Sequence, residues 1–222
     1  MLTIDPDNAE GHNNLGITLY DLGQPNAACK SYMNALAIEP EYAEAHSNLG
    51  ITLNELGRFE AAEASYNRAL AIAPHFSEAY SNLGDLLTDL KRLDEALVSY
   101  ETAFNLKPDI IFLLGKLLHT KMHLCLWDDL SRMLDELQDK IHNNEKVTPP
   151  FPMLGLIDDP ELQRKATEIF VNENFQKNHD LPKIGFYPCL LYTSDAADDS
   201  LRVDLGGRRI IKKVPATRWL CD

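Results

Sequence analysis

The sequence lacks the segments that mark membrane-spanning and exported proteins. It has no run of about 18 apolar residues, the length that a membrane-spanning helix needs. Its start has no basic stretch followed by an apolar one, as a secretory signal would have. Cysteine is scarce, and the four present show no paired spacing: Cys29, Cys125, Cys189 and Cys221. Free thiols suit a reducing compartment, so we expect a cytoplasmic protein with no membrane partner.

Basic residues are also few, with 21 Lys and Arg against 34 Asp and Glu and a net charge of −13. Binding to phosphates needs clustered Lys and Arg, so nucleic acid is not an expected partner. We interpret the acidity as a contribution to solubility. Residues 1–188 contain no Gly-rich phosphate loop and no nucleophile–base pair or metal set, so no cofactor and no independent enzyme is predicted.

The chain does contain one segment repeated three times at a spacing of 34 residues. The copies begin at Ala9, Ala43 and Ser77, and each opens with a block that ends in Asn-Leu-Gly. A small residue, a tyrosine and a proline follow in constant register: Ala28, Tyr32 and Pro40; Ala62, Tyr66 and Pro74; Ala96, Tyr100 and Pro108. Repeats of this length build solenoids, in which each helix pair buries its apolar face on the next.

The second copy shows how the repeat would fold. Its leucines recur at helical spacing and form one apolar stripe, made of Leu49, Leu53 and Leu56. Gly50 and Ala62 are small enough for two antiparallel helices to approach closely. Gly57 should end the first helix, and Pro74 cannot continue the second. The sequence therefore predicts an all-α fold, a right-handed superhelix of antiparallel helix pairs.

Residues 9–108 resemble the tetratricopeptide repeat (TPR) family, whose pattern is an aromatic residue, Leu-Gly, Ala, a second aromatic residue and a closing proline. The resemblance makes the three repeated tyrosines helix-packing residues. The same register aligns residues 1–8 with the end of a repeat, through Leu2, Ile4 and Pro6. We therefore expect 1–8 to be the remnant of a preceding repeat, and the natural chain to begin further upstream.

After Pro108 the helical spacing continues but the repeat pattern ends. Residues 110–118 are apolar on too many sides for a surface helix and should be buried, and Trp127 is expected in the core. Apolar spacing and prolines predict three further elements: a helix over 128–142, a stiff extended linker over 148–152, and a helix from Pro160 to about Asn174. Residues 109–188 are thus predicted to form a helical connector.

Four stretches of this connector resemble the one in TPR-containing protein O-linked N-acetylglucosamine transferases: 118–122, 125–127, 150–154 and 158–163. Residues 181–188 resemble the start of that family's catalytic domain. The resemblance implies that UDP-GlcNAc is the donor of the full-length protein, and that its catalytic residues lie beyond Pro188. None can be assigned here, so we expect an acceptor-recognition fragment that is inactive by itself, with no catalytic, cofactor-binding or metal-binding residues.

Residues 189–222 differ in character from the rest. Residues 189–198 and 203–211 resemble translations of a transposase-type sequencing adapter and of a flow-cell sequence. The four codons between them have room for a sample barcode in one reading frame. We therefore treat 189–222 as non-native, disordered read-through, and give no function to the basic pairs within it.

Asn14, Asn48 and Asn82 occupy one position in the three copies, just before Leu-Gly. The family resemblance implies that asparagines on the inner face of the superhelix hold an acceptor polypeptide by its backbone. A primary amide offers both a donor and an acceptor, so it can pair with any peptide unit. The alternative is that these residues face solvent or cap a neighbour. The expected partner is a protein or peptide in the concave groove.

Two other functions were weighed. A free-standing TPR adaptor could grip a peptide carboxylate with Lys and Arg, but the corresponding positions hold Glu10, Glu44 and Glu78, and Asn13, Ser47 and Ser81. A metal site could use His119 and His123, which are four residues apart on one helix face. Cys125 lies on another face and a fourth ligand is not evident, so no metal site is predicted there.

Overall fold

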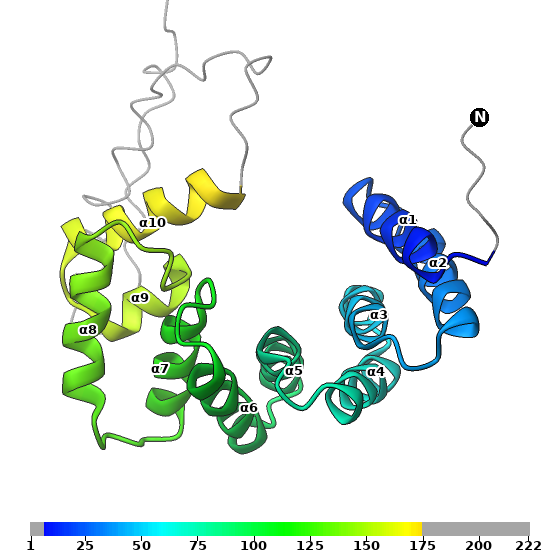
Figure 1. Ribbon diagram of the computed structural model, residues 1–222. Helices are drawn as coiled ribbons and strands as arrows, with labels where there is room; N and C mark the ends of the chain where they lie inside the picture. Colours follow the sequence, from blue (N-terminus) through cyan, green and yellow to red (C-terminus); the bar gives the residue numbers. More distant parts are fainter. Residues whose placement is uncertain (1–6, 175–222) are drawn as a thin grey trace, which may run out of the picture. The chain divides into compact units, whose positions relative to one another are not determined.

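A computed structural model describes residues 7–174 of the chain (Figure 1). Residues 1–6, most of the predicted N-terminal remnant, lie outside the described residues. So do the end of the predicted connector, 175–188, and the adapter-like tail, 189–222.

The described residues form helices and contain no strand, which confirms the predicted all-α fold. The helices are α1 (Ala9–Asp21), α2 (Pro25–Ile38), α3 (Ala43–Glu55), α4 (Phe59–Ile72), α5 (Ser77–Asp89), α6 (Leu93–Leu106), α7 (Leu113–His123), α8 (Leu130–His142), α9 (Pro150–Leu156) and α10 (Pro160–Asn174).

The first six helices form three successive pairs, α1 with α2, α3 with α4, and α5 with α6. Each pair packs on the next through α2 against α3 and α4 against α5. The first helices of neighbouring pairs also touch, α1 with α3 and α3 with α5, and lie on the inner side of the curve that these six helices follow (Figure 1). We call the exposed surface of α1, α3 and α5 the inner face.

A tyrosine packed on a glycine holds each pair together. Tyr66 is 1% exposed, and a Cβ atom at Gly50 would lie 2.7 Å from its ring. Tyr100 packs in the same way on Gly84, where a Cβ atom would lie 2.5 Å from the ring. Only a glycine lets the ring approach this closely, since interiors are packed at crystal-like density. The prediction that the repeated tyrosines are helix-packing residues is confirmed.

The turn within each pair needs a left-handed backbone. Gly57 has a φ of +71°, which ends α3 as predicted, and Gly23 has a φ of +70° after α1. The third copy has Lys91 at this position, with a φ of +63°. A side chain in this conformation costs roughly 1 kcal/mol relative to glycine, so the third turn is strained.

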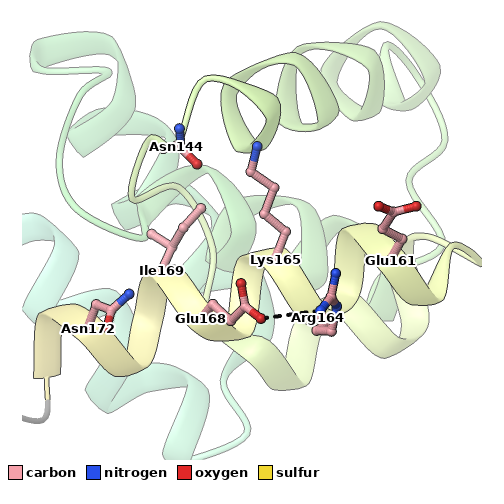
Figure 2. Close-up of a pocket in the computed structure, with 7 residues that line it drawn as sticks. All are labelled: Asn144, Glu161, Arg164, Lys165, Glu168, Ile169 and Asn172. Atoms are coloured by element: carbon pink, nitrogen blue, oxygen red, sulfur yellow. Dashed lines mark ion pairs between the residues drawn. The ribbon is translucent and has the colours of Figure 1, made fainter.

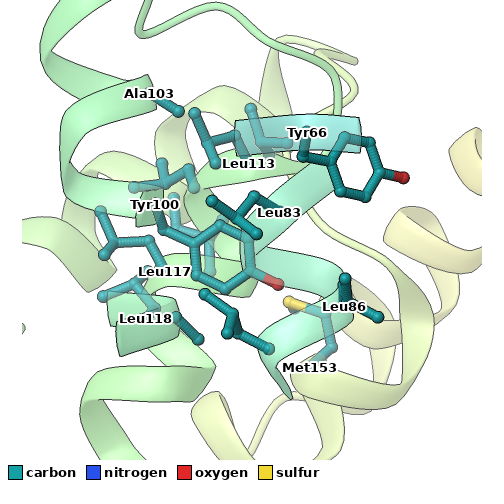
Figure 3. Close-up of a cluster of buried hydrophobic side chains, with 14 of the residues drawn as sticks. Tyr66, Leu83, Leu86, Tyr100, Ala103, Leu113, Leu117, Leu118 and Met153 are labelled. Carbon is teal, nitrogen blue, oxygen red and sulfur yellow. The ribbon is translucent and has the colours of Figure 1, made fainter. Parts of the chain in front are cut away.

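The helices after α6 continue the apolar core. The leucines of α7 are buried, as predicted: Leu113, Leu114, Leu117 and Leu118. They join Tyr100 and Ala103 of α6 and Met153 of α9 in one cluster (Figure 3). Helix α7 contacts α8 and α9, and α10 contacts both of these. The helices of this region therefore pack on the last repeat and on one another.

Two predictions for this region were wrong. Trp127 is 60% exposed, because it lies in the connection between α7 and α8 and not on a packed helix face. The expected extended linker over 148–152 is largely helical, since α9 begins at Pro150, directly after its extended N-cap Pro149. Pro150 and Pro152 both fall in the first turn, where the backbone N–H that proline lacks would have no helical partner. The predicted helix over 128–142 begins slightly later, at Leu130.

Candidate polypeptide-binding face

The three predicted binding residues lie on the first helix of each pair, α1, α3 and α5. Asn14 is exposed, whereas Asn48 and Asn82 are half-buried. They hold the same register on helices that touch side by side, so they occupy corresponding positions of α1, α3 and α5. We call Asn14, Asn48 and Asn82 the asparagine series.

The middle amide of the series already has one partner. The Nδ2 of Asn48 donates a hydrogen bond of 3.1 Å to the Oδ1 of Asn13, which is 2% exposed on α1. This bond links two successive repeats, so part of the alternative interpretation, contact with a neighbour, holds for Asn48. Its carbonyl oxygen and second N–H remain for a peptide unit.

Asn82 lines a hollow of about 170 Å³ on this face. The other lining residues come from the three inner helices and from α4: Tyr20, Ile51, Asn54, Glu55, Tyr66 and Asp85. The hollow is thus lined by two carboxylates and two amides, beside the apolar side chain of Ile51 and two tyrosine rings. We call this the inner hollow.

The electrostatics of the inner hollow are set by its carboxylates. Asp85 accepts hydrogen bonds from the Tyr100 hydroxyl at 2.8 Å and from Lys116 Nζ at 2.6 Å. Burial, together with a hydrogen bond to the carboxylate of Glu55, raises the pKa of Tyr20 to about 12. Burial, and then the charge of Asp85, hold the pKa of Tyr66 well above its usual value. Both hydroxyls of the hollow are therefore protonated at neutral pH.

The positions that a carboxylate-gripping adaptor would use are occupied differently. Asn13, Ser47 and Ser81 are 2%, 3% and 4% exposed, so they lie between helices. Glu78 pairs with Lys107 at 2.8 Å, and this bond lowers the pKa of Glu78. These positions therefore add negative or neutral groups to the inner helices, and no cation.

A second hollow, of about 220 Å³, lies between Asn144 and α10 (Figure 2). Its charged groups largely satisfy one another or the backbone. Arg164 lies 3.7 Å from Glu168, and Lys165 donates to the backbone oxygen of His142 at 2.9 Å. Because these charges are paired, we assign no binding role to this hollow.

The two histidines considered for a metal touch each other. His119 and His123 place their Nε2 atoms 3.2 Å apart, and Phe151 packs edge-on against His119. Burial lowers the pKa of His119, and the neighbouring His123 lowers it further. In residues 7–174, no group of three His, Cys, Asp or Glu side chains could hold a metal ion. In the same residues, no helix is both long and apolar enough to cross a bilayer.

The sequence analysis did not identify Tyr66, Asn54 and Glu55 as residues that line the inner hollow. A signal was present in the repeat alignment. The position that holds Asp85 in the third copy holds Ile51 in the second and Ile17 in the first. Isoleucine cannot accept the hydrogen bond that Asp85 accepts from Tyr100, and the second copy also has Leu86 where the first has Thr52 beside Tyr32, so the two exchanges together mark the hollow.

Comparison with known proteins gives a consistent result. Two family models described as tetratricopeptide repeat match residues 7–75 and 53–111. No curated protein matches the chain. A crystal structure of MamA is similar at 27% identity and a TM-score of 0.57, covering 63% of this chain and 81% of MamA.

Two further solved structures share the fold. The first TPR of Spaghetti (RPAP3), bound to the HSP90 peptide SRMEEVD, is 24% identical with a TM-score of 0.52, over 55% of this chain and 99% of that one. The TPR domain of Arabidopsis OM64 is 24% identical with a TM-score of 0.51, over 53% of this chain and 98% of that one. Residues 7–111 are therefore tetratricopeptide repeats, and the described residues 7–174 have the all-α fold of a TPR solenoid.

Proposed function

We propose that the inner face binds an extended polypeptide through the asparagine series, Asn14, Asn48 and Asn82. The observation that carries this proposal is the constant register of the three amides on α1, α3 and α5, which touch one another in order. Each amide can pair with a peptide unit whatever its side chain, and three in series multiply the effect. The peptide-bound TPR of Spaghetti supports this use of the fold.

We further propose that the chain is the acceptor-recognition part of a protein O-GlcNAc transferase-like glycosyltransferase. The support is the resemblance of 118–122, 125–127, 150–154 and 158–163 to the connector of those enzymes. On this proposal the protein is cytoplasmic, UDP-GlcNAc is used by a domain beyond Pro188, and residues 1–188 transfer no sugar. An uninterrupted gene sequence that continues into a nucleotide-sugar domain would support it, and an early stop codon would contradict it.

A free-standing TPR adaptor is the second candidate, and the paired charges of the inner helices bear on it. Lys116 is held by Asp85 and Lys107 by Glu78, so neither cation is available to grip a peptide carboxylate. An adaptor of this chain would therefore bind an internal segment of its partner.

The peptide-binding proposal can be tested by NMR. Capped peptides of alternating glycine and serine, with no charge, are titrated into protein labelled with ¹⁵N. We expect the side-chain amide signals of Asn14, Asn48 and Asn82 to shift together, because all three contact one backbone. Signals of Asn67 on α4 serve as the control and should not move. Equal shifts at Asn67 and at the series would contradict a site on the inner face.

A further inference from the structure

The hydroxyl of Tyr66 has no hydrogen-bond partner among the described residues, although the residue is only 1% exposed. Among the described residues, the fully buried side-chain N or O atom without a partner is His12 Nδ1, so the Tyr66 hydroxyl keeps access to solvent through the hollow that it lines and can meet a ligand atom there. Figure 3 shows this hydroxyl pointing away from the apolar cluster, and Tyr66 lines the inner hollow.

The equivalent tyrosines of the other two copies are satisfied. The Tyr100 hydroxyl donates to Asp85 at 2.8 Å and lies 3.3 Å from Thr88 Oγ1. Tyr32 has a hydrogen bond to Thr52. In the second copy, the positions that correspond to these hydrogen-bond partners hold Ile51, Leu86 and Asn54. Ile51 and Leu86 have no polar group, and Asn54 makes no hydrogen bond to Tyr66. The second copy is thus the place where a ligand atom can complete the pattern.

The inner hollow around this hydroxyl has an excess of acceptors. Glu55 accepts from the neutral Tyr20 hydroxyl and has no ion pair among the described residues, and the amides of Asn54 and Asn82 supply further carbonyl oxygens. Glu55 is also the last residue of α3, where the helix dipole is already negative and a carboxylate is unfavourable. Asp21 and Asp89 hold the same register at the ends of α1 and α5. This end of the inner face therefore attracts a cation.

We propose that the inner hollow binds an arginine side chain of the polypeptide held by the inner face, an inference that rests on the proposed peptide binding. A guanidinium group presents five N–H donors in one plane, which suits acceptors spread over Glu55, Tyr66 and Asn82. The arginine stem would lie along Ile51 and the ring of Tyr20. A lysine ammonium has three donors on one atom and satisfies fewer of these acceptors.

The test uses the full chain and three capped nonapeptides of alternating glycine and serine, with arginine, lysine or citrulline at the centre. Citrulline has the shape of arginine without its charge. Calorimetry should show the arginine peptide binding about tenfold more tightly than the citrulline peptide, as one charge-assisted pair predicts. The lysine peptide should fall between them. Equal affinity for arginine and citrulline would contradict the inference, as would the absence of saturable binding by the arginine peptide.

Two variants separate this inference from the proposed function. Tyr66→Phe removes the unpartnered hydroxyl and keeps the ring, and Glu55→Gln removes the charge. Both variants should bind the arginine peptide several-fold more weakly than the native chain does, and should bind the citrulline peptide with unchanged affinity. Glu60→Gln, the same charge change on the outer helix α4, is the control and should affect neither. Thermal unfolding of Tyr66→Phe checks that the fold is kept. If the arginine preference survives both variants, the hollow is not its source, even where peptide binding itself is intact.

Discussion

Lys116 Nζ on α7 donates to Asp85 Oδ2 on α5 at 2.6 Å. Lys116 follows Asn82 by one repeat length, so it holds the position that a fourth asparagine of the series would hold. The series of neutral amides therefore ends in an ion pair where the repeat pattern ends, and this pair ties the last repeat to the helices that follow.

The first prediction concerns this ion pair. Both side chains are partly exposed, at 26% for Lys116 and 36% for Asp85. A double-mutant cycle with Asp85→Asn and Lys116→Met should give a coupling of about 1 kcal/mol in the free energy of unfolding, and added salt should reduce it. Additive effects at low salt would show that the pair adds nothing to stability.

The second prediction concerns the packing of tyrosine on glycine. Gly50→Ala would place a methyl group against the Tyr66 ring, 2.7 Å away, so we expect a loss of about 1–3 kcal/mol in urea unfolding. Gly155→Ala is the matched control on α9, because the nearest atom is the flexible end of Met122 at 3.0 Å. The control should be near neutral. A neutral Gly50→Ala would mean that the ring has room to move.

The third prediction concerns the strained turn. Lys91→Gly should raise the free energy of unfolding by roughly 0.5–1 kcal/mol, because glycine adopts the left-handed backbone of this turn without steric cost. The converse change, Gly57→Ala, should lower it by a similar amount. Thermal melts of both variants check this. Destabilisation by Lys91→Gly would contradict the assignment of strain.

The fourth prediction concerns the start of α10. Asp159 Oδ1 accepts from the backbone N–H groups of Glu161 at 2.9 Å and Leu162 at 3.2 Å. Asp159→Ala should cost about 1 kcal/mol and increase hydrogen exchange in the first turns of α10. Asp158→Ala removes a neighbouring carboxylate that caps nothing and should change exchange little. Equal effects of the two variants would refute a specific cap.

The repeats could be predicted from sequence because each position is used three times. Local geometry requires the glycine that packs against the buried tyrosine, Ala62 where the two helices cross, and Gly57 in the turn. The repeated pattern therefore specifies the fold. The resemblance to TPR proteins identified this fold as a TPR solenoid. The helix from Pro160 to Asn174 was equally accessible, because proline in a first turn and an acidic cap mark its start.

The errors lie where the pattern ends. Trp127 is large and apolar, but hydrophobicity alone does not say whether a residue in a connection faces inward, and this one is exposed. The prolines of 148–152 predict an extended linker, but Pro150 and Pro152 in a first turn are compatible with a helix.

The inner hollow could not be predicted from one repeat at a time. Tyr66 follows the family pattern, and its missing partner is visible only when Ile51 is compared with Asp85 in the next copy and the two are placed beside the tyrosine. Whether a hydroxyl is satisfied depends on residues of neighbouring helices, and the helical register alone does not specify their distances. The role of the asparagine series stays a prediction for the same reason.

The central claim is that the inner face binds a polypeptide by its backbone. The most direct measurement is the affinity of an uncharged capped glycine–serine peptide for the native chain and for the triple variant Asn14→Ala, Asn48→Ala and Asn82→Ala. With circular dichroism confirming the fold, we predict a loss of at least about tenfold, since each lost amide removes a hydrogen bond of about 1 kcal/mol. Unchanged affinity in a folded triple variant would contradict the account.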